Sequence, residues 1–143
     1  MDVDKRVVCI EENVRGVCSK VKRKGREILN DFSITAPQFE ALLVLTKRKN
    51  ITIGELSNNM NLACSTVTEL IYRMEKNEFV RRSRDLNDKR IVKIIVMEKG
   101  YKVIDEVLNR RREYLRDIFK DYSDKEIDVI NKMFKVLNNS MSL

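Results

Sequence analysis

A single β-rich stretch, from Val80 to Met97, interrupts a sequence whose other segments carry apolar residues at helical spacing. Its two halves flank Asp85-Leu86-Asn87-Asp88, residues typical of turns, so the stretch predicts a two-stranded antiparallel hairpin. One small hairpin in an otherwise helical chain predicts a mainly α fold. The tip and edges of the hairpin carry four basic residues: Arg82, Arg84, Lys89 and Arg90.

The segment before the hairpin, residues 51 to 77, predicts two short helices joined by a tight turn. Thr52 is a helix cap, and the residues from Asn58 to Asn61 tolerate turn or left-handed geometry. The second helix is expected from Cys64 to Asn77, with Val67, Leu70, Ile71 and Met74 facing inward. Its outward face then holds polar side chains: Ser65, Thr68, Glu69, Tyr72 and Arg73.

A helix-turn-helix followed directly by a basic hairpin is the pattern of a winged helix. Side chains of this size reach base edges and phosphates in a major groove, although an ordinary polar surface explains the helix face equally well. The hairpin favours the DNA interpretation, because Arg side chains enter the negative minor groove and the Asp88 carboxylate can orient Arg90. Asp85 and Asp88 also suit the turn itself, and both roles are compatible.

The remaining segments predict long helices. Residues 3 to 30 repeat apolar residues in a heptad that Lys24 and Gly25 interrupt, and such a seam packs along another helix. Thr35 and Gln38 form a capping box that opens a helix ending at Lys47 to Asn50. Two further helices are expected, from Lys99 to Lys120 and from Asp124 onward, with Ser123 and Glu126 as a second capping box. The heptad positions are Val3, Val7, Ile10, Val14, Val17, Val21 and Ile28.

Composition narrows the function classes. The 143 residues carry a formal net charge of +7, which favours a polyanionic partner but does not separate DNA from RNA or an anionic membrane. Histidine is absent, which removes the usual nucleophile pairs, the imidazole general base and most transition-metal sites. None of the four glycines belongs to a phosphate-binding loop. We expect no enzyme activity, no catalytic residue, no metal and no cofactor.

The sequence also carries no signal for export or membrane insertion. No stretch approaches the ~20 apolar residues that cross a bilayer, and acidic residues are mixed into the N-terminal segment where a signal peptide has none. Three cysteines without C-x-x-C spacing indicate neither a disulfide framework nor a zinc ribbon. We therefore expect a cytoplasmic protein with no membrane partner.

The order of these segments resembles the MarR family of winged helix-turn-helix transcriptional regulators. The most specific stretch is Asp85-x-x-Asp88-x-Arg90 with Gly100 beyond the second strand, which is similar to the family's wing signature. Thr35-Ala-Pro-Gln38-Phe39 resembles the family's second-helix opening, and Ser65-Thr66-Val67-Thr68 with Met74-Glu75-Lys76 resembles its recognition helix. Each motif is modest alone, but together, in this order and spacing, they are specific.

The resemblance implies one domain over residues 1–143, with dimerisation helices at 1–34 and 101–143 around a DNA-binding lobe at 35–100. It implies a homodimeric repressor that binds double-stranded DNA at a pseudo-palindromic operator and leaves it when a small aromatic or lipophilic effector binds. The residues matching Ser65, Thr66, Thr68 and Arg73 meet the major groove in the family. The residue matching Arg90 enters the minor groove, braced by the one matching Asp88.

The chain departs from the family pattern at four positions. Ala63 stands where a capping Ser is common, Glu78 where a Gly ends the recognition helix, and Met97 where a Thr caps the helix leading to Gly100. A lost cap costs ~1 kcal/mol, which a packed domain tolerates, so the fold is not in doubt. Glu69 replaces a residue that is often basic, and its carboxylate repels phosphates but accepts from a cytosine amino group.

Two alternatives to an effector-released repressor stay open. Cys9 and Cys18 lie on the predicted dimer helix, where a redox-sensing branch of the family carries its reactive thiol, although a cysteine is more often a small buried hydrophobe. A winged helix also serves as a protein-interaction module, but the basic wing and polar helix face argue against that.

RNA binding needs exposed aromatic residues, and Tyr72 is the one available on the reading face.

Overall fold

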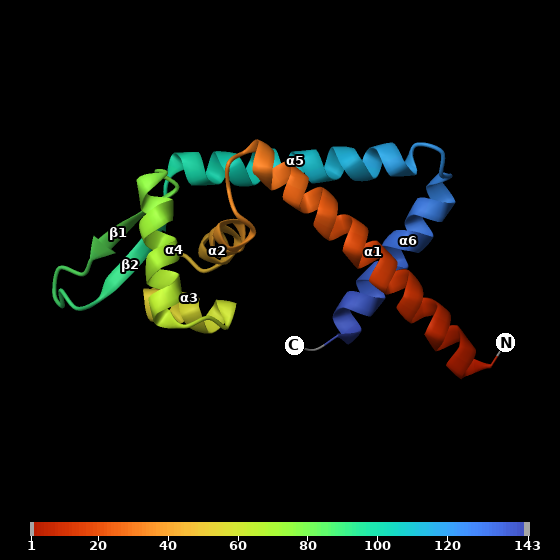
Figure 1. Cartoon of the computed structure of the whole chain (residues 1–143), viewed down its shortest axis with the longest axis horizontal. Helices are drawn as coiled ribbons and strands as arrows, with labels where there is room; N and C mark the ends of the chain where they lie inside the picture. The colour runs from red at the N-terminus through yellow and green to blue at the C-terminus, as the bar shows by residue number, and fades with distance from the viewer. Residues whose placement is uncertain (1, 142–143) are drawn as a thin grey trace. The chain divides into compact units, whose positions relative to one another are not determined.

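The computed structural model describes residues 2–141, which form six helices and one two-stranded antiparallel sheet (Figure 1). This confirms the mainly α fold with a β-hairpin. Residue 1 and residues 142–143, which the predicted domain ranges include, lie outside the described residues. The chain divides into two compact units after Leu108. The elements are α1 (Val3–Asp31), α2 (Ala36–Lys47), α3 (Ile53–Met60), α4 (Cys64–Lys76), β1 (Val80–Arg84), β2 (Val92–Val96), α5 (Glu98–Phe119) and α6 (Asp124–Ser140).

The core of the first unit is built from α2, α3, α4 and the hairpin together with the end of α1 and the first half of α5. Leu42, Leu56 and Ile71 supply fully buried side chains from the three helices, and Ile94 supplies one from β2. Three of the four predicted inward positions of α4 are buried, and Leu70 is partly buried. Apolar burial of this kind contributes roughly 25 cal/mol per Å² and fixes the face of α4 that stays outside.

The hairpin belongs to the same core through one face. Val80 pairs with Val96, Arg82 with Ile94 and Arg84 with Val92, so these side chains share a face of the sheet. On the other edge of β2, the Ile94 N–H donates to the Ile51 carbonyl at 3.0 Å, and Thr52 bridges Lys93. The segment before α3 therefore holds β2 in place, and β1 is the strand farther from it.

The predicted long first helix and the predicted capping residues Thr35 and Ser123 are present in the structure. The α1 helix runs from Val3 to Asp31, close to the predicted range, and Lys24 and Gly25, which interrupt the apolar heptad, lie within it. Thr35 and Gln38 form the predicted capping box at the start of α2. Ser123 caps α6 by accepting from the Glu126 N–H, while the Glu126 carboxylate accepts from the Ser123 hydroxyl instead of a backbone N–H.

The turn of the helix-turn-helix is shorter than predicted. Asn58, Asn59 and Met60 remain helical, and Asn61 alone adopts the left-handed conformation, with φ 53°. Two hydrogen bonds close this end, from Asn61 N–H to the Asn58 carbonyl and from Leu62 N–H to the Ser57 carbonyl. A left-handed residue with these two bonds forms a Schellman motif, which satisfies the last carbonyls of the helix.

The end of α4 repeats this motif with a residue poorly suited to it. Glu78 has φ 63°, and the bonds Glu78 N–H to Glu75 carbonyl and Phe79 N–H to Met74 carbonyl complete the motif. A side chain with a β-carbon is strained in this conformation, and glycine is the usual residue. The start of α4 is also weakened, because Ala63 provides no side-chain cap.

We expect Glu78→Gly to stabilise the protein. Relief of the left-handed conformation gains about 1–2 kcal/mol, and the greater freedom of glycine in the unfolded chain offsets about half of this. The measurement is the free energy of unfolding in urea, with Glu78→Ala as control, since alanine keeps the β-carbon. Equal stability of the alanine and glycine variants would show that strain at Glu78 is not the cause.

The first turn of α5 packs closely against the end of α4 and the sheet. Lys99 donates from Nζ to the Asn77 carbonyl at 2.8 Å and lies 5.2 Å from the centre of the Phe79 ring. Gly100 is buried, and a β-carbon added there would lie 2.4 Å from the Phe79 carbonyl oxygen and 2.8 Å from Val96 Cγ1. Glycine at position 100 is therefore required by space.

Apolar side chains outside the core concentrate on α1 and α6. Six of the seven heptad positions of α1 are exposed in the single chain, and Ile28 alone is buried. The second unit, considered by itself, has no buried residue along α6. Across residues 2–141, no helix combines the length and apolarity that crossing a membrane requires.

Candidate nucleic-acid interface

The outward face of α4 is polar and exposed, as predicted. Ser65, Thr68 and Tyr72 follow one another at steps of three and four residues, and Glu69 and Arg73 continue the same face. Thr66 is exposed beside this face in the first turn. Because Val67, Ile71 and Met74 anchor the opposite side in the core, the polar face has a fixed orientation on the lobe.

Local contacts hold the side chains of this face. Arg73 donates from Nε to Glu69 Oε1 at 3.1 Å, and both side chains are largely exposed. Thr68 donates its hydroxyl to the Cys64 carbonyl at 2.8 Å, which leaves the hydroxyl oxygen free to accept. Lys76 lies 4.8 Å from the centre of the Tyr72 ring. An exposed pair one helical turn apart is worth less than about 1 kcal/mol, so Arg73 exchanges Glu69 for another acceptor at little cost.

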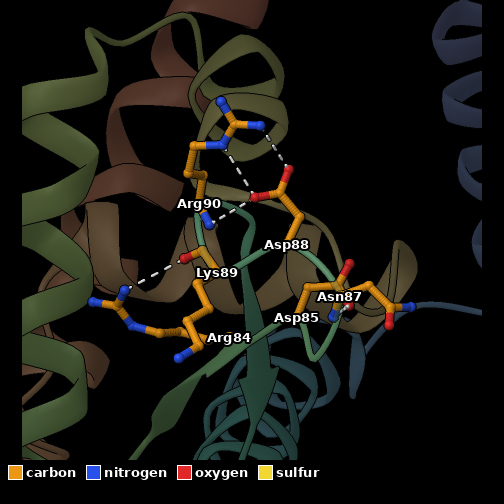
Figure 2. Close-up of polar contacts among 6 residues, drawn as sticks. All are labelled: Arg84, Asp85, Asn87, Asp88, Lys89 and Arg90. Atoms are coloured by element: carbon orange, nitrogen blue, oxygen red, sulfur yellow. Dashed lines mark hydrogen bonds and ion pairs between the residues drawn. The ribbon is translucent and has the colours of Figure 1, made fainter.

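Asp88 and Arg90 are joined by three hydrogen bonds at the hairpin tip (Figure 2). Arg90 donates from Nε to Asp88 Oδ1 at 3.1 Å and from a terminal nitrogen to Oδ2 at 3.3 Å, while its backbone N–H donates to Oδ1 at 3.0 Å. These hydrogen bonds, first those from the Arg90 side chain, lower the pKa of Asp88 below its ordinary value. The contact that the sequence suggests between Asp88 and Arg90 is present, and the guanidinium remains accessible because the Arg90 side chain is 91% exposed.

The rest of the tip is closed by turn chemistry. Asp85 accepts from the Asn87 N–H at 3.2 Å, and the backbone bond from Asp85 N–H to the Ile91 carbonyl closes the loop. Across the loop, Arg84 donates to the Lys89 carbonyl at 3.3 Å (Figure 2). Arg84 at the end of β1 and Lys89 and Arg90 in the loop are exposed around the tip that these hydrogen bonds close.

Arg82 lies apart from the other predicted wing residues. Its guanidinium contacts the Glu75 carboxylate of α4, with 3.0 Å from a terminal nitrogen and 3.2 Å from Nε to Oε1, and its backbone N–H donates to Oε2 at 2.9 Å. The backbone bond from Arg82 is the main cause that lowers the pKa of Glu75. Sequence reasoning missed Glu75; the available signal was that Arg82 shares the strand phase of the apolar Val80.

The three cysteines lie on two different helices, two on α1 and one at the start of α4. Cys9 and Cys18 are exposed on α1, nine residues or about 13 Å apart along the helix, which is too far for a disulfide within the chain. Their predicted redox role remains a prediction. Cys64 is also exposed, but its sulfur lies 3.2 Å from the hydroxyl of the buried Ser57, at the start of α4.

Comparison with known proteins gives consistent matches. Residues 34–92 match the model described as MarR family, which includes the helix-turn-helix and most of the hairpin. A protein of Bacillus subtilis (strain 168), described as the uncharacterized HTH-type transcriptional regulator YsmB, is 47% identical over 135 residues. That similarity covers 94% of this chain and 92% of the relative, so it extends beyond the lobe to the terminal helices.

Solved structures agree with this similarity. A MarR family protein from Bacillus stearothermophilus superposes with a TM-score of 0.88 at 40% identity, covering 99% of both chains. A MepR variant from S. aureus, solved bound to an oligodeoxyribonucleotide, has a TM-score of 0.75 at 18% identity and covers 93% of this chain and 98% of its own. The second likeness concerns the fold alone.

Proposed function

The chain belongs to the MarR family, and from this we propose that it is a homodimeric repressor that reads a pseudo-palindromic operator and leaves it when a small effector binds. It is a winged helix-turn-helix transcriptional regulator that binds DNA. The observation that carries the proposal is that one lobe presents both a polar α4 face and a basic tip with an oriented, accessible Arg90.

Each part of the lobe suits one groove of duplex DNA. Thr68 offers an acceptor, Arg73 a bidentate donor for guanine and Glu69 an acceptor for the cytosine amino group, which together match the major-groove code. Arg90, held by Asp88 at the end of a narrow hairpin, suits the negative minor groove. The MepR variant, which shares the fold, was solved bound to an oligodeoxyribonucleotide, which supports DNA as the partner of this fold.

The exposed apolar side chains support a homodimer. Monomeric proteins rarely leave so many large apolar residues in contact with water. The described part of the chain exposes them on α1 and, separately, on α6, so a second copy is the simplest partner. The side chains concerned are Val3, Val7, Ile10, Val14, Val17 and Val21 on α1, and Val129, Met133, Phe134, Val136, Leu137 and, just past the helix, Met141.

One pocket in the first unit supports the proposal that a small effector binds this protein. It has a volume of about 310 Å³, and its lining residues include Phe32, Phe79, Lys99, Lys102 and Glu106. This size and this mixture of rings and cations suit a small aromatic molecule. The pocket adjoins the end of α4 at Asn77, so a bound molecule is placed to disturb the reading helix.

The test is selection of bound sequences from a random duplex library at physiological salt with competitor DNA. We expect a two-fold symmetric motif with half-sites about one helical turn, ~34 Å, apart, because each protomer of a dimer contributes one reading helix. The recovered operator then serves to screen small aromatic compounds for release and to measure the sign of regulation in a reporter. Recovery of no motif, or of a motif without symmetry, would contradict the proposal.

A further inference from the structure

Glu75 joins α4 to the hairpin through two hydrogen bonds and one further ion-pair contact with a single residue, Arg82. Its carboxylate accepts from the Arg82 backbone N–H at 2.9 Å and from Arg82 Nε at 3.2 Å, and a terminal nitrogen of the same guanidinium lies 3.0 Å from Oε1. Glu75 lies in the last turn of α4, and Arg82 is the central residue of β1. The sequence predicts Arg82 as a DNA contact of the wing. In the structure its guanidinium contacts the Glu75 carboxylate of α4 instead.

We propose that Glu75 and Arg82 are positioning residues: their contact fixes the wing relative to the reading helix, and Arg82 does not itself bind phosphate. The inference rests on the proposed reading of DNA and assigns how the two reading elements keep their relative geometry. A duplex presents its grooves at fixed separations, so a lobe that reads two grooves needs that geometry set before binding.

The strand register supports this assignment. Arg82 pairs with the buried Ile94 and shares a face with the buried Val80, so its side chain leaves the sheet on the side that packs against the lobe. Arg81, the next residue along, leaves on the opposite side with Lys93 and Ile95 near it in register. The chain therefore provides a matched arginine in the same strand that does not face Glu75.

Partial burial raises the free energy needed to separate Arg82 from Glu75. The Glu75 side chain is 32% exposed and the Arg82 side chain 41%, in contrast to the freely exposed Arg90. Hydrogen bonds between charged, partly buried groups are stronger than those of exposed pairs. Pulling Arg82 away to meet a phosphate would leave the Glu75 carboxylate with reduced solvation and no partner, beside a polyanion.

The experiment compares wild type, Glu75→Gln, Arg82→Met, the double variant and Arg81→Met on one selected operator over a range of salt. We expect each single change at the pair to weaken binding about fivefold, and the double variant to weaken it no further, because the two residues act as one unit. The slope of log affinity against log salt stays that of wild type in these variants. Loss of a phosphate contact in both protomers would instead make it shallower by about 1.8.

A second measurement follows the wing without DNA. Hydrogen exchange of the β1 amides is expected to be about fivefold faster in Glu75→Gln and faster still in Glu75→Ala, which also loses the acceptor for the Arg82 N–H. Arg81→Met should leave this exchange unchanged. Circular dichroism and thermal melting establish that every variant is folded.

The outcomes separate this inference from the proposed function. If wild type binds no duplex, the proposed function fails and the inference fails with it. If wild type binds, the inference alone is overturned by tighter binding of Glu75→Gln, by a shallower salt slope in Arg82→Met, or by β1 exchange that is unchanged in both Glu75 variants. Weaker binding at an unchanged slope, with faster exchange, supports it.

Discussion

Replacing Arg90 with alanine weakens binding to duplex DNA of every sequence, by about a hundredfold in a dimer. The guanidinium stands at the wing tip, 91% exposed and oriented by two side-chain hydrogen bonds to Asp88. Loss of one charge-assisted contact costs about 1.5 kcal/mol, two protomers double it, and each 1.4 kcal/mol is a factor of ten in affinity. The measurement is the dissociation constant for the selected operator and for a scrambled duplex at physiological salt.

Arg15→Ala is the matched control for Arg90. Arg15 is an exposed arginine that also donates two hydrogen bonds to a neighbouring carboxylate, that of Glu11, but it lies on α1. It removes the same charge from the chain, so a general effect of net charge would appear in both variants. If Arg90→Ala bound as tightly as wild type, or if Arg15→Ala lost as much affinity, the wing would not be a DNA contact.

Replacing Gly100 with alanine destabilises the protein by about 1–2 kcal/mol in total, because overpacking a dense core costs about 2–3 kcal/mol. The added β-carbon would lie 2.4 Å from the Phe79 carbonyl oxygen, and this carbonyl accepts the Met97 N–H at 2.9 Å. Since a backbone atom so engaged cannot move aside cheaply, either α5 or the end of α4 must shift. The gain of about 1 kcal/mol that alanine brings to a helix offsets part of the loss.

Gly54→Ala is the control, measured by urea unfolding under the same conditions. Gly54 lies in the first turn of α3 in the same unit, and an added β-carbon would meet nothing closer than Thr52 Oγ1 at 3.8 Å. We expect it to be neutral or stabilising by up to about 1 kcal/mol. If Gly100→Ala proved as stable as Gly54→Ala, the packing of α5 on Phe79 would be looser than the structure has it.

Much of the fold followed from local chemistry in the sequence. Thr35 with Gln38 defined the start of α2, and Asp85 with Asp88 defined the turn of the hairpin, because their side chains bond to backbone groups two or three residues away. The helical spacing of its apolar residues predicted which face of α4 is buried. Such contacts are short in sequence, so residue types and spacing are enough to predict them.

What the sequence did not predict depends on contacts between elements. The partnership of Glu75 with Arg82 needs the last turn of α4 to lie beside β1, which a helix pattern and a strand pattern do not specify separately. Without that contact between elements, charge alone predicts the same role for Arg82 as for Arg84 and Arg90. The helical conformation of Asn58 and Asn59 shows a third case, since packing of Leu56 and Met60 outweighs the turn preference of asparagine.

The contact of Lys99 with the end of α4 has a mechanical consequence. Lys99 and Gly100 belong to the first turn of α5, and through the Asn77 carbonyl and the Phe79 backbone they fasten this turn to the end of the reading helix. The first turn of α5 therefore cannot shift relative to the end of α4 without breaking the Lys99 hydrogen bond or disturbing the close packing of Gly100. Because Val67, Ile71 and Met74 also hold α4 in the core, displacing this turn would disturb the packing of the lobe itself.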